Sequence, residues 1–180
     1  MRRPNACENL KNKRNSFQSS LFQEVPLCLI QRCIAENESK LKNFPSVASF
    51  KMSSVWKNVS IEPGGILDFE ETVRFNDSIK RVSAGNFLLS HPGLYIVQIQ
   101  LHFLHSAQVA FVINGQEQSD SVLGTSGEGG ALQGFCTFRT ETADSVLSII
   151  NPLQNTRPMV VSLYAGGTIP ITSDLMIFRM

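Results

Sequence analysis

The segment from Leu94 to Phe103 alternates apolar and polar side chains with a period of two. Its apolar positions include Val97, Ile99, Leu101 and Phe103, and the polar positions between them are Gln98, Gln100 and His102. Successive side chains of a β-strand point to opposite faces, so this pattern predicts a strand with one apolar and one polar face. It is the clearest secondary-structure signal in the chain.

Short runs rich in Val, Ile, Leu and Phe occur from residue 53 to the C-terminus, separated by Gly, Pro, Asn and Asp. No long helical period competes with them. One run ends at Asn114-Gly115, a pair typical of tight hairpin turns. The spacing predicts an all-β protein, an antiparallel jelly-roll sandwich of about eight to ten strands. The other candidate strands are residues 53–59, 66–75, 85–90, 109–113, 132–140, 146–151, 159–165 and 174–179.

Composition changes along the chain. All 12 glycines lie at or after Gly64. Residues 1–52 carry nine basic and four acidic side chains, a net charge of +5, whereas residues 53–180 carry seven and eleven, a net charge of −4. We therefore expect a boundary near residues 45 to 52, with a basic, cysteine-containing N-terminal extension over 1–52 and a jelly-roll domain over 53–180. The extension is expected to be partly helical, over 27–41, or disordered.

Three of the four cysteines, Cys7, Cys28 and Cys33, lie in this extension. Their spacing does not match a zinc site. Reduced thiols on a loose tail are the first expectation for these residues. The alternative is covalent cross-linking between neighbouring subunits under oxidising conditions, which an odd set of cysteines on a flexible arm allows. Charged residues follow Arg2 and Arg3 where a signal peptide would have its apolar core, so conventional secretion is not expected.

Several function classes lack support in the sequence. The net charge of +1 offers no basic field for nucleic acid. No apolar run approaches the roughly 20 residues that a membrane-spanning helix needs, so no membrane insertion is expected. Cys136 lies in an apolar run and is predicted to be a core residue, and His102 and His105 point to opposite faces of a strand. We predict a protein that is not an enzyme and has no catalytic residues, cofactor or metal site.

The segment Asn86–Tyr95, reading NFLLSHPGLY, and the alternating strand after it resemble a passage of the complement-globular-head and tumour necrosis factor (TNF) jelly rolls. Val109–Gly115 is similar to the next strand and its Asn-Gly turn in this superfamily, and Gly134–Asn151 to the paired strands that follow. Ser173–Arg179 and Gly124–Gly130 are similar to the C-terminal domain of exosporium glycoproteins of the BclA type. Together these motifs cover most of residues 65–180.

The resemblance implies a homotrimer. In related trimeric domains, the strand after the Gly-Leu-Tyr motif turns its second face toward the threefold axis. The residues placed there would be Ile96, Gln98, Gln100 and His102. Glutamine copies would hydrogen-bond across the axis and set the register of the trimer, and protonated His102 copies would repel one another. Simple exposure of this face to water is the alternative.

The resemblance also implies a function. BclA-type proteins carry a collagen-like stalk of Gly-X-Y repeats, and this chain has no glycine before Gly64. We therefore expect an unstalked structural or adhesive protein of a bacterial spore outer layer, an exosporium, whose partners are its own copies and other spore-surface proteins. The alternative is a secreted binding module that recognises a receptor or glycan through segments such as Gly124–Gly130 and Asn151–Pro158.

Overall fold

The structure, a computed structural model, describes residues 46–52, 58–74, 78–162, 164 and 173–180. Every regular element in these ranges is a β-strand, which confirms the all-β prediction. The strands are β1 (Ser46–Met52), β2 (Val59–Ile61), β3 (Glu70–Arg74), β4 (Ile79–Ser83), β5 (Asn86–Leu89), β6 (Gly93–His102), β7 (Ala107–Ile113), β8 (Gln116–Glu117), β9 (Leu123–Thr125), β10 (Ala131–Thr140), β11 (Ser145–Ile150), β12 (Met159–Val161) and β13 (Ser173–Arg179).

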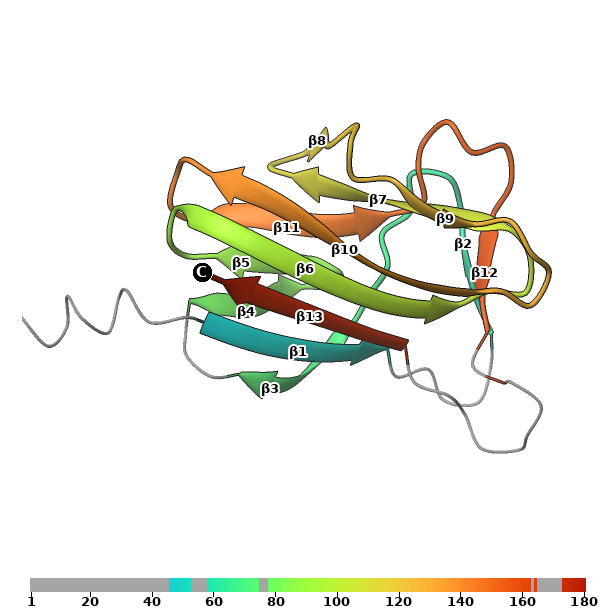
Figure 1. Cartoon of the computed structure of the whole chain (residues 1–180), viewed down its shortest axis with the longest axis horizontal. Coiled ribbons are helices and arrows are strands. Elements are labelled where there is room, and N and C mark those ends of the chain that lie inside the picture. Colours follow the sequence, from blue (N-terminus) through green and yellow to red (C-terminus); the bar gives the residue numbers. More distant parts are fainter. Residues whose placement is uncertain (1–45, 53–57, 75–77, 163, 165–172) are drawn as a thin grey trace, which may run out of the picture. The chain divides into compact units, whose positions relative to one another are not determined.

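The strands form two large antiparallel sheets and one small one (Figure 1). The β6 sheet has five strands in the order β10-β6-β13-β1-β3. The β11 sheet has the order β4-β5-β11-β7-β8, with β9 also paired to β7, and β12 pairs with β2. The two large sheets pack as a jelly-roll sandwich, as predicted. The described residues form 13 strands, more than the predicted eight to ten, because two- and three-residue strands such as β8 and β2 are too short to give a periodic signal.

The sandwich core follows from the alternation along β6. Tyr95, Val97, Ile99 and Leu101 are all fully buried, and the side chains between them face away from the core. A residue period of two places every second side chain on the same face of a sheet. The predicted apolar face of this strand is therefore the inner face of the β6 sheet.

The described sandwich reaches back to Ser46, near the start of the range of residues 45 to 52 in which the boundary is expected. β1 lies inside the β6 sheet, paired with β13 on one side and β3 on the other, and the compact unit begins at Pro45. Ala48 and Phe50 are fully buried, and the Phe50 ring lies 4.5 Å from the Phe87 ring of the facing sheet. Lys51 counts toward the basic charge of residues 1–52, although it is an exposed residue of this half-buried strand.

The Asn114-Gly115 turn is confirmed. Both residues have positive φ, 51° and 80°, and they join β7 to β8. The Asn114 side chain also accepts a hydrogen bond of 2.8 Å from the Val146 amide of β11. A turn with positive φ at both central residues matches the twist of its strands, which explains the Asn-Gly pair.

Candidate functional site

The four residues predicted for the trimer interface lie together on one face. Ile96, Gln98, Gln100 and His102 are on the face of β6 that points away from the core, and all four are partly or fully exposed in the single chain. We call this side of the β6 sheet the outer face. A trimer interface and a face that is simply exposed to water would both place these residues on the outer face. The trimer contact therefore stays a prediction.

The outer face also carries an apolar band that the sequence analysis missed. We define it as Ile96, Phe135, Met176 and Phe178. Phe135 of β10 and Met176 of β13 lie opposite Gln98 from the two sides, and Phe178 lies opposite Ile96. Phe135 is 71% exposed, an unusual value for a phenylalanine in the middle of a strand. An apolar band of this kind on a sheet is typical of a surface that a partner covers.

The alternation of inward and outward side chains along β10 is the sequence signal that identifies the exposed position of Phe135 in this band. Leu132, Cys136 and Phe138 share one parity and face the core, whereas Phe135 has the opposite parity. Residues 135–138 form an apolar run when they are taken as one block, and this hides the difference between the two faces of the strand. A strict two-residue period assigns Phe135 to the outside.

Cys136 is a core-facing residue, as predicted. Its side chain packs against the hydrophobic core. Burial raises the pKa of the Cys136 thiol, and the nearby Asp120 carboxylate raises it further. A raised pKa lowers the fraction of thiolate, the nucleophilic form, so the thiol is poorly suited to catalysis at neutral pH. Cys7, Cys28 and Cys33 lie outside the described residues.

The described part of the chain lacks the features of a metal centre and of a membrane-spanning helix. No group of three or more His, Cys, Asp or Glu side chains there is arranged to hold a metal ion. Within the same residues, no helix has the length and apolar character needed to cross a membrane.

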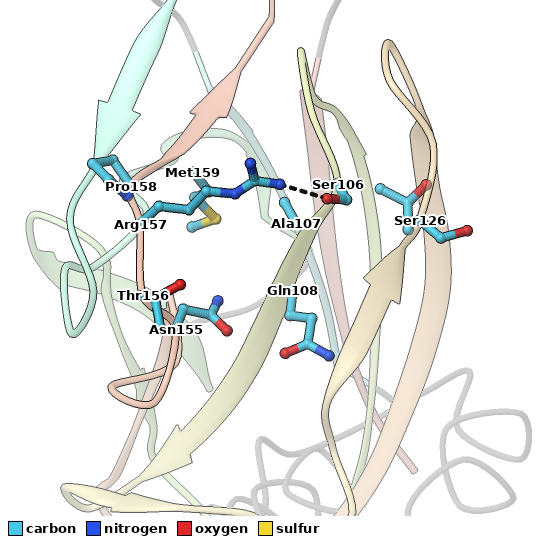
Figure 2. A pocket seen from close by; sticks show the side chains of 10 residues that line it. Ser106, Ala107, Gln108, Ser126, Asn155, Thr156, Arg157, Pro158 and Met159 are labelled. Carbon is cyan, nitrogen blue, oxygen red and sulfur yellow. Dashed lines mark hydrogen bonds between the residues drawn. The ribbon is translucent and has the colours of Figure 1, made fainter.

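A pocket of about 340 Å³ opens where three segments meet, and we call it the loop pocket (Figure 2). Its walls are the start of β7 with Ser106, the end of β9 with Ser126, and residues 155–159 leading into β12. Two of these walls belong to Gly124–Gly130 and Asn151–Pro158, the two segments that the alternative function named as recognition loops. The fold therefore brings two segments about 30 residues apart in the sequence into one concave site.

The polar side chains that line the loop pocket are Ser106, Gln108, Thr125, Ser126, Asn155, Thr156 and Arg157. Arg157 is the one charged residue among the lining residues, and its guanidinium donates a hydrogen bond of 2.7 Å to the Ser106 hydroxyl (Figure 2). No Asp or Glu lines the pocket. The site is thus polar, with a single positive charge.

A scan against protein-family models and a search of curated proteins gave no match to this sequence. Solved structures do match. The Eiger TNF of S. frugiperda has a TM-score of 0.59 at 12% identity, over 76% of this chain and 94% of that one. The globular domain of zebrafish complement 1qA has a TM-score of 0.54 at 10% identity, over 76% and 97%. Murine APRIL, in a structure determined at pH 8.5, has a TM-score of 0.52 at 13% identity, over 76% and 100%.

These likenesses define the class of fold. The chain has the same jelly-roll fold as the TNF and complement globular heads, which confirms the predicted fold. The finer likeness to the BclA C-terminal domain stays a prediction from the sequence motifs. Function at this level of identity has to be argued from the sites, because one fold serves many functions.

Proposed function

We propose that this protein is a non-enzymatic homotrimeric module that acts by assembly and binding, as the TNF-like and complement-like fold suggests. The observation that carries the proposal is the apolar band on the outer face. Phe135, Met176 and Phe178 flank the predicted interface residues of β6, and no layer of the described chain covers them. Two further copies of the chain are the proposed cover.

The outer face carries polar as well as apolar side chains, which fits a contact between copies that is specific and not merely hydrophobic. Gln98 is exposed beside Phe135, and Gln100 lies opposite both Gln133 of β10 and Asp174 of β13. Burying amides without partners costs about 1–3 kcal/mol each, so the copies must align to pair them. The apolar side chains would supply affinity, and the amides would select one register.

The spore surface is the location that we propose for this module, as a structural or adhesive component of an exosporium-like layer. Support comes from the similarity of Ser173–Arg179 and Gly124–Gly130 to BclA-type domains. Cys7, Cys28 and Cys33 would then cross-link the trimer to neighbouring proteins of the layer. If replacing all three with serine leaves extraction by a reductant unchanged, cross-linking by these cysteines is wrong.

The solution mass of the full chain, measured by light scattering at pH 7.5 and pH 5, tests the trimer. We expect three chains at pH 7.5. Dissociation at pH 5 in the wild type, but not in His102→Gln, would place His102 near the axis, because three imidazolium charges there repel. A monomer at both pH values, across micromolar protein concentrations, would overturn the trimer.

A second candidate function, a secreted module that recognises a receptor or glycan, has one specific observation in its favour. The two segments named for that role, Gly124–Gly130 and Asn151–Pro158, contribute two walls of the loop pocket. Both functions share the trimeric head and differ in what the head contacts. The polar lining of the loop pocket and its single arginine indicate the class of ligand that it could bind.

A further inference from the structure

We infer that the loop pocket binds an acidic sugar at the end of a glycan, with Arg157 holding the sugar's carboxylate. The site lies within one protomer and is built from residues of that protomer alone. It therefore extends the proposed function without depending on the trimer.

Charge is the first argument. Arg157 is exposed at the pocket, and its one hydrogen bond to a side chain in the described part of the chain goes to Ser106. Guanidinium has five N–H donors in a planar fork that matches a carboxylate. No acidic side chain lines the pocket, and Glu128, on the neighbouring turn, is not among the lining residues. The one charged side chain that lines the pocket is therefore a cation, and it keeps N–H donors for a bidentate contact with an anion.

The neutral lining is the second argument. Hydroxyl groups of Ser106, Thr125, Ser126 and Thr156 both donate and accept hydrogen bonds, and the amides of Gln108 and Asn155 add further donors and acceptors. Sugar hydroxyls need partners of both kinds. Ala107, Pro158 and Met159 supply apolar surface for the ring carbons. A carboxylate beside several hydroxyls on one small ring matches this combination better than a peptide, whose anchors are mostly apolar.

The size of the pocket is compatible with such a ligand. Its volume of about 340 Å³ lies at the lower end of small-molecule sites, which range over about 300–1,000 Å³. Figure 2 shows Asn155 and Thr156 facing Gln108 of β7 across the opening, with the Arg157 side chain extending toward Ser106. A terminal sugar that enters from the open side would lie between these side chains.

The pocket wall is held in place by Asn151, which is fully buried behind it. Its side-chain amide donates to the Ile61 carbonyl at 2.9 Å, and its side-chain oxygen accepts a bond of 2.6 Å from Asn155. The backbone of Leu104 donates to Val160 and accepts from Gly129, both at 3.0 Å, which ties together the three segments that meet at the pocket. A wall fixed before binding lowers the entropy cost of binding.

The test compares charged and neutral ligands, with the glucuronide and the glucoside as a pair that differs only at C6. Full-length protein labelled with ¹⁵N is titrated with methyl glucuronide, methyl glucoside, a methyl sialoside and acetate, and binding is followed by amide chemical shifts. A single sugar on a polar surface binds weakly, with a Kd on the order of 1 mM. We expect at least one acidic sugar to bind about tenfold or more tightly than the glucoside, with shifts at residues 106–108 and 155–159.

Variants locate the interaction. Arg157→Gln should weaken acidic-sugar binding about tenfold or more and leave glucoside binding unchanged, and Arg157→Lys should lose part of the effect because it keeps the charge without the fork. Gln108→Ala should weaken both sugars. Lys80→Gln is the matched control, because it removes one positive charge from β4, at the other end of the domain from β9 and β12 (Figure 1).

Three results would overturn the inference. They are equal affinity for charged and neutral sugars, wild-type affinity in a folded Arg157→Gln protein, and acetate binding as tightly as the acidic sugars, which would indicate a general carboxylate site. Light scattering on the same samples separates this inference from the proposed function. A monomer that binds glucuronide would contradict only the trimer, and a trimer that binds no acidic sugar would contradict only the sugar site.

Discussion

Gln98 of β6 and Phe135 of β10 lie directly opposite each other on the outer face of the β6 sheet. One is an exposed amide, and the other is a phenylalanine ring that is 71% exposed. Directly opposed side chains on a sheet face lie close enough to be covered by the same partner surface. In the proposed trimer contact, Phe135 would therefore contribute affinity and the neighbouring Gln98 would contribute specificity.

Replacing Phe135 with serine should convert the proposed trimer to a monomer that is still folded. The ring is exposed in the protomer, so its loss there costs about 0.5 kcal/mol or less. Its burial between copies is worth about 1.5–3 kcal/mol per chain. Light scattering reports the mass, and circular dichroism the fold. The control is Leu153→Ser, since Leu153 is 69% exposed on the segment between β11 and β12, away from the outer face; a monomer there too would point to general loss of solubility or folding.

Truncating Phe50 should lower the free energy of unfolding by about 3–5 kcal/mol, as expected for a buried phenylalanine. Phe50 has no exposed surface and packs on Phe87 across the sandwich. Lys51→Ala, one residue on, should change it by about 0.5 kcal/mol or less, because its ion pair with Asp174 is long, 3.8 Å, and solvent-exposed. Urea unfolding at a fixed protomer concentration measures both. Similar changes in the free energy of unfolding for the two variants would contradict the placement of β1 in the sandwich.

Two glycines with positive φ should respond differently to alanine. Gly85 has φ +66°, and a Cβ there would collide with Ile66 Cγ2 and lie 2.6 Å from the Leu67 carbonyl oxygen. Gly115 has φ +80° and open space around it. Gly115→Ala should cost about 1–2 kcal/mol for the left-handed backbone alone. Gly85→Ala should cost about 1–3 kcal/mol more, because backbone atoms must shift. Thermal unfolding of the two variants side by side tests the difference.

Asp68 should matter more than its partner Arg81. Arg81 Nη2 lies 2.9 Å from both carboxylate oxygens of Asp68, and the Gly85 amide donates to Asp68 at 2.7 Å. Arg81→Ala removes a partly exposed ion pair, worth about 0.2–1 kcal/mol. Asp68→Ala also leaves the Gly85 N–H without its acceptor, for a total of about 1–3 kcal/mol. Equal losses in urea unfolding would show that the amide bond contributes nothing.

Tyr95 should make stability fall at high pH. Burial raises the pKa of the Tyr95 phenol above its usual value of 10.0, an effect that Arg179 partly offsets. The unfolded chain then loses this proton first as pH rises, so the stability that Tyr95 contributes is full below about pH 10 and is lost above it. The hydroxyl also donates to the His91 carbonyl at 2.6 Å.

The measurement is the free energy of unfolding from pH 8 to 11 in the wild type and in Tyr95→Phe. The wild type should lose more stability than the variant above pH 10, and phenolate absorbance assigned by difference should rise above that pH. Parallel curves for the two proteins would contradict a raised pKa at Tyr95.

The parts of the fold that could be predicted are those with a local signal. The period of two along β6 and the Asn-Gly pair after β7 each report on neighbours in the sequence, and both appear in the structure as expected. β4 was missed because Lys80 and Arg81 break its apolar pattern, although Ile79 is fully buried. β1 was missed because its inward residues include a small alanine and its outward ones a lysine.

The sequence by itself determined the all-β class, the inner face of β6 and the hairpin turn, because side-chain alternation and backbone preferences act over a few residues. Only the tertiary structure decided that β1 lies between β13 and β3, that Phe135 joins Met176 on the outer face, and that Arg157 meets Ser106 at a pocket. Each of these pairings joins residues distant in the chain. Their register is set by the packing of the whole sandwich, which no local pattern encodes.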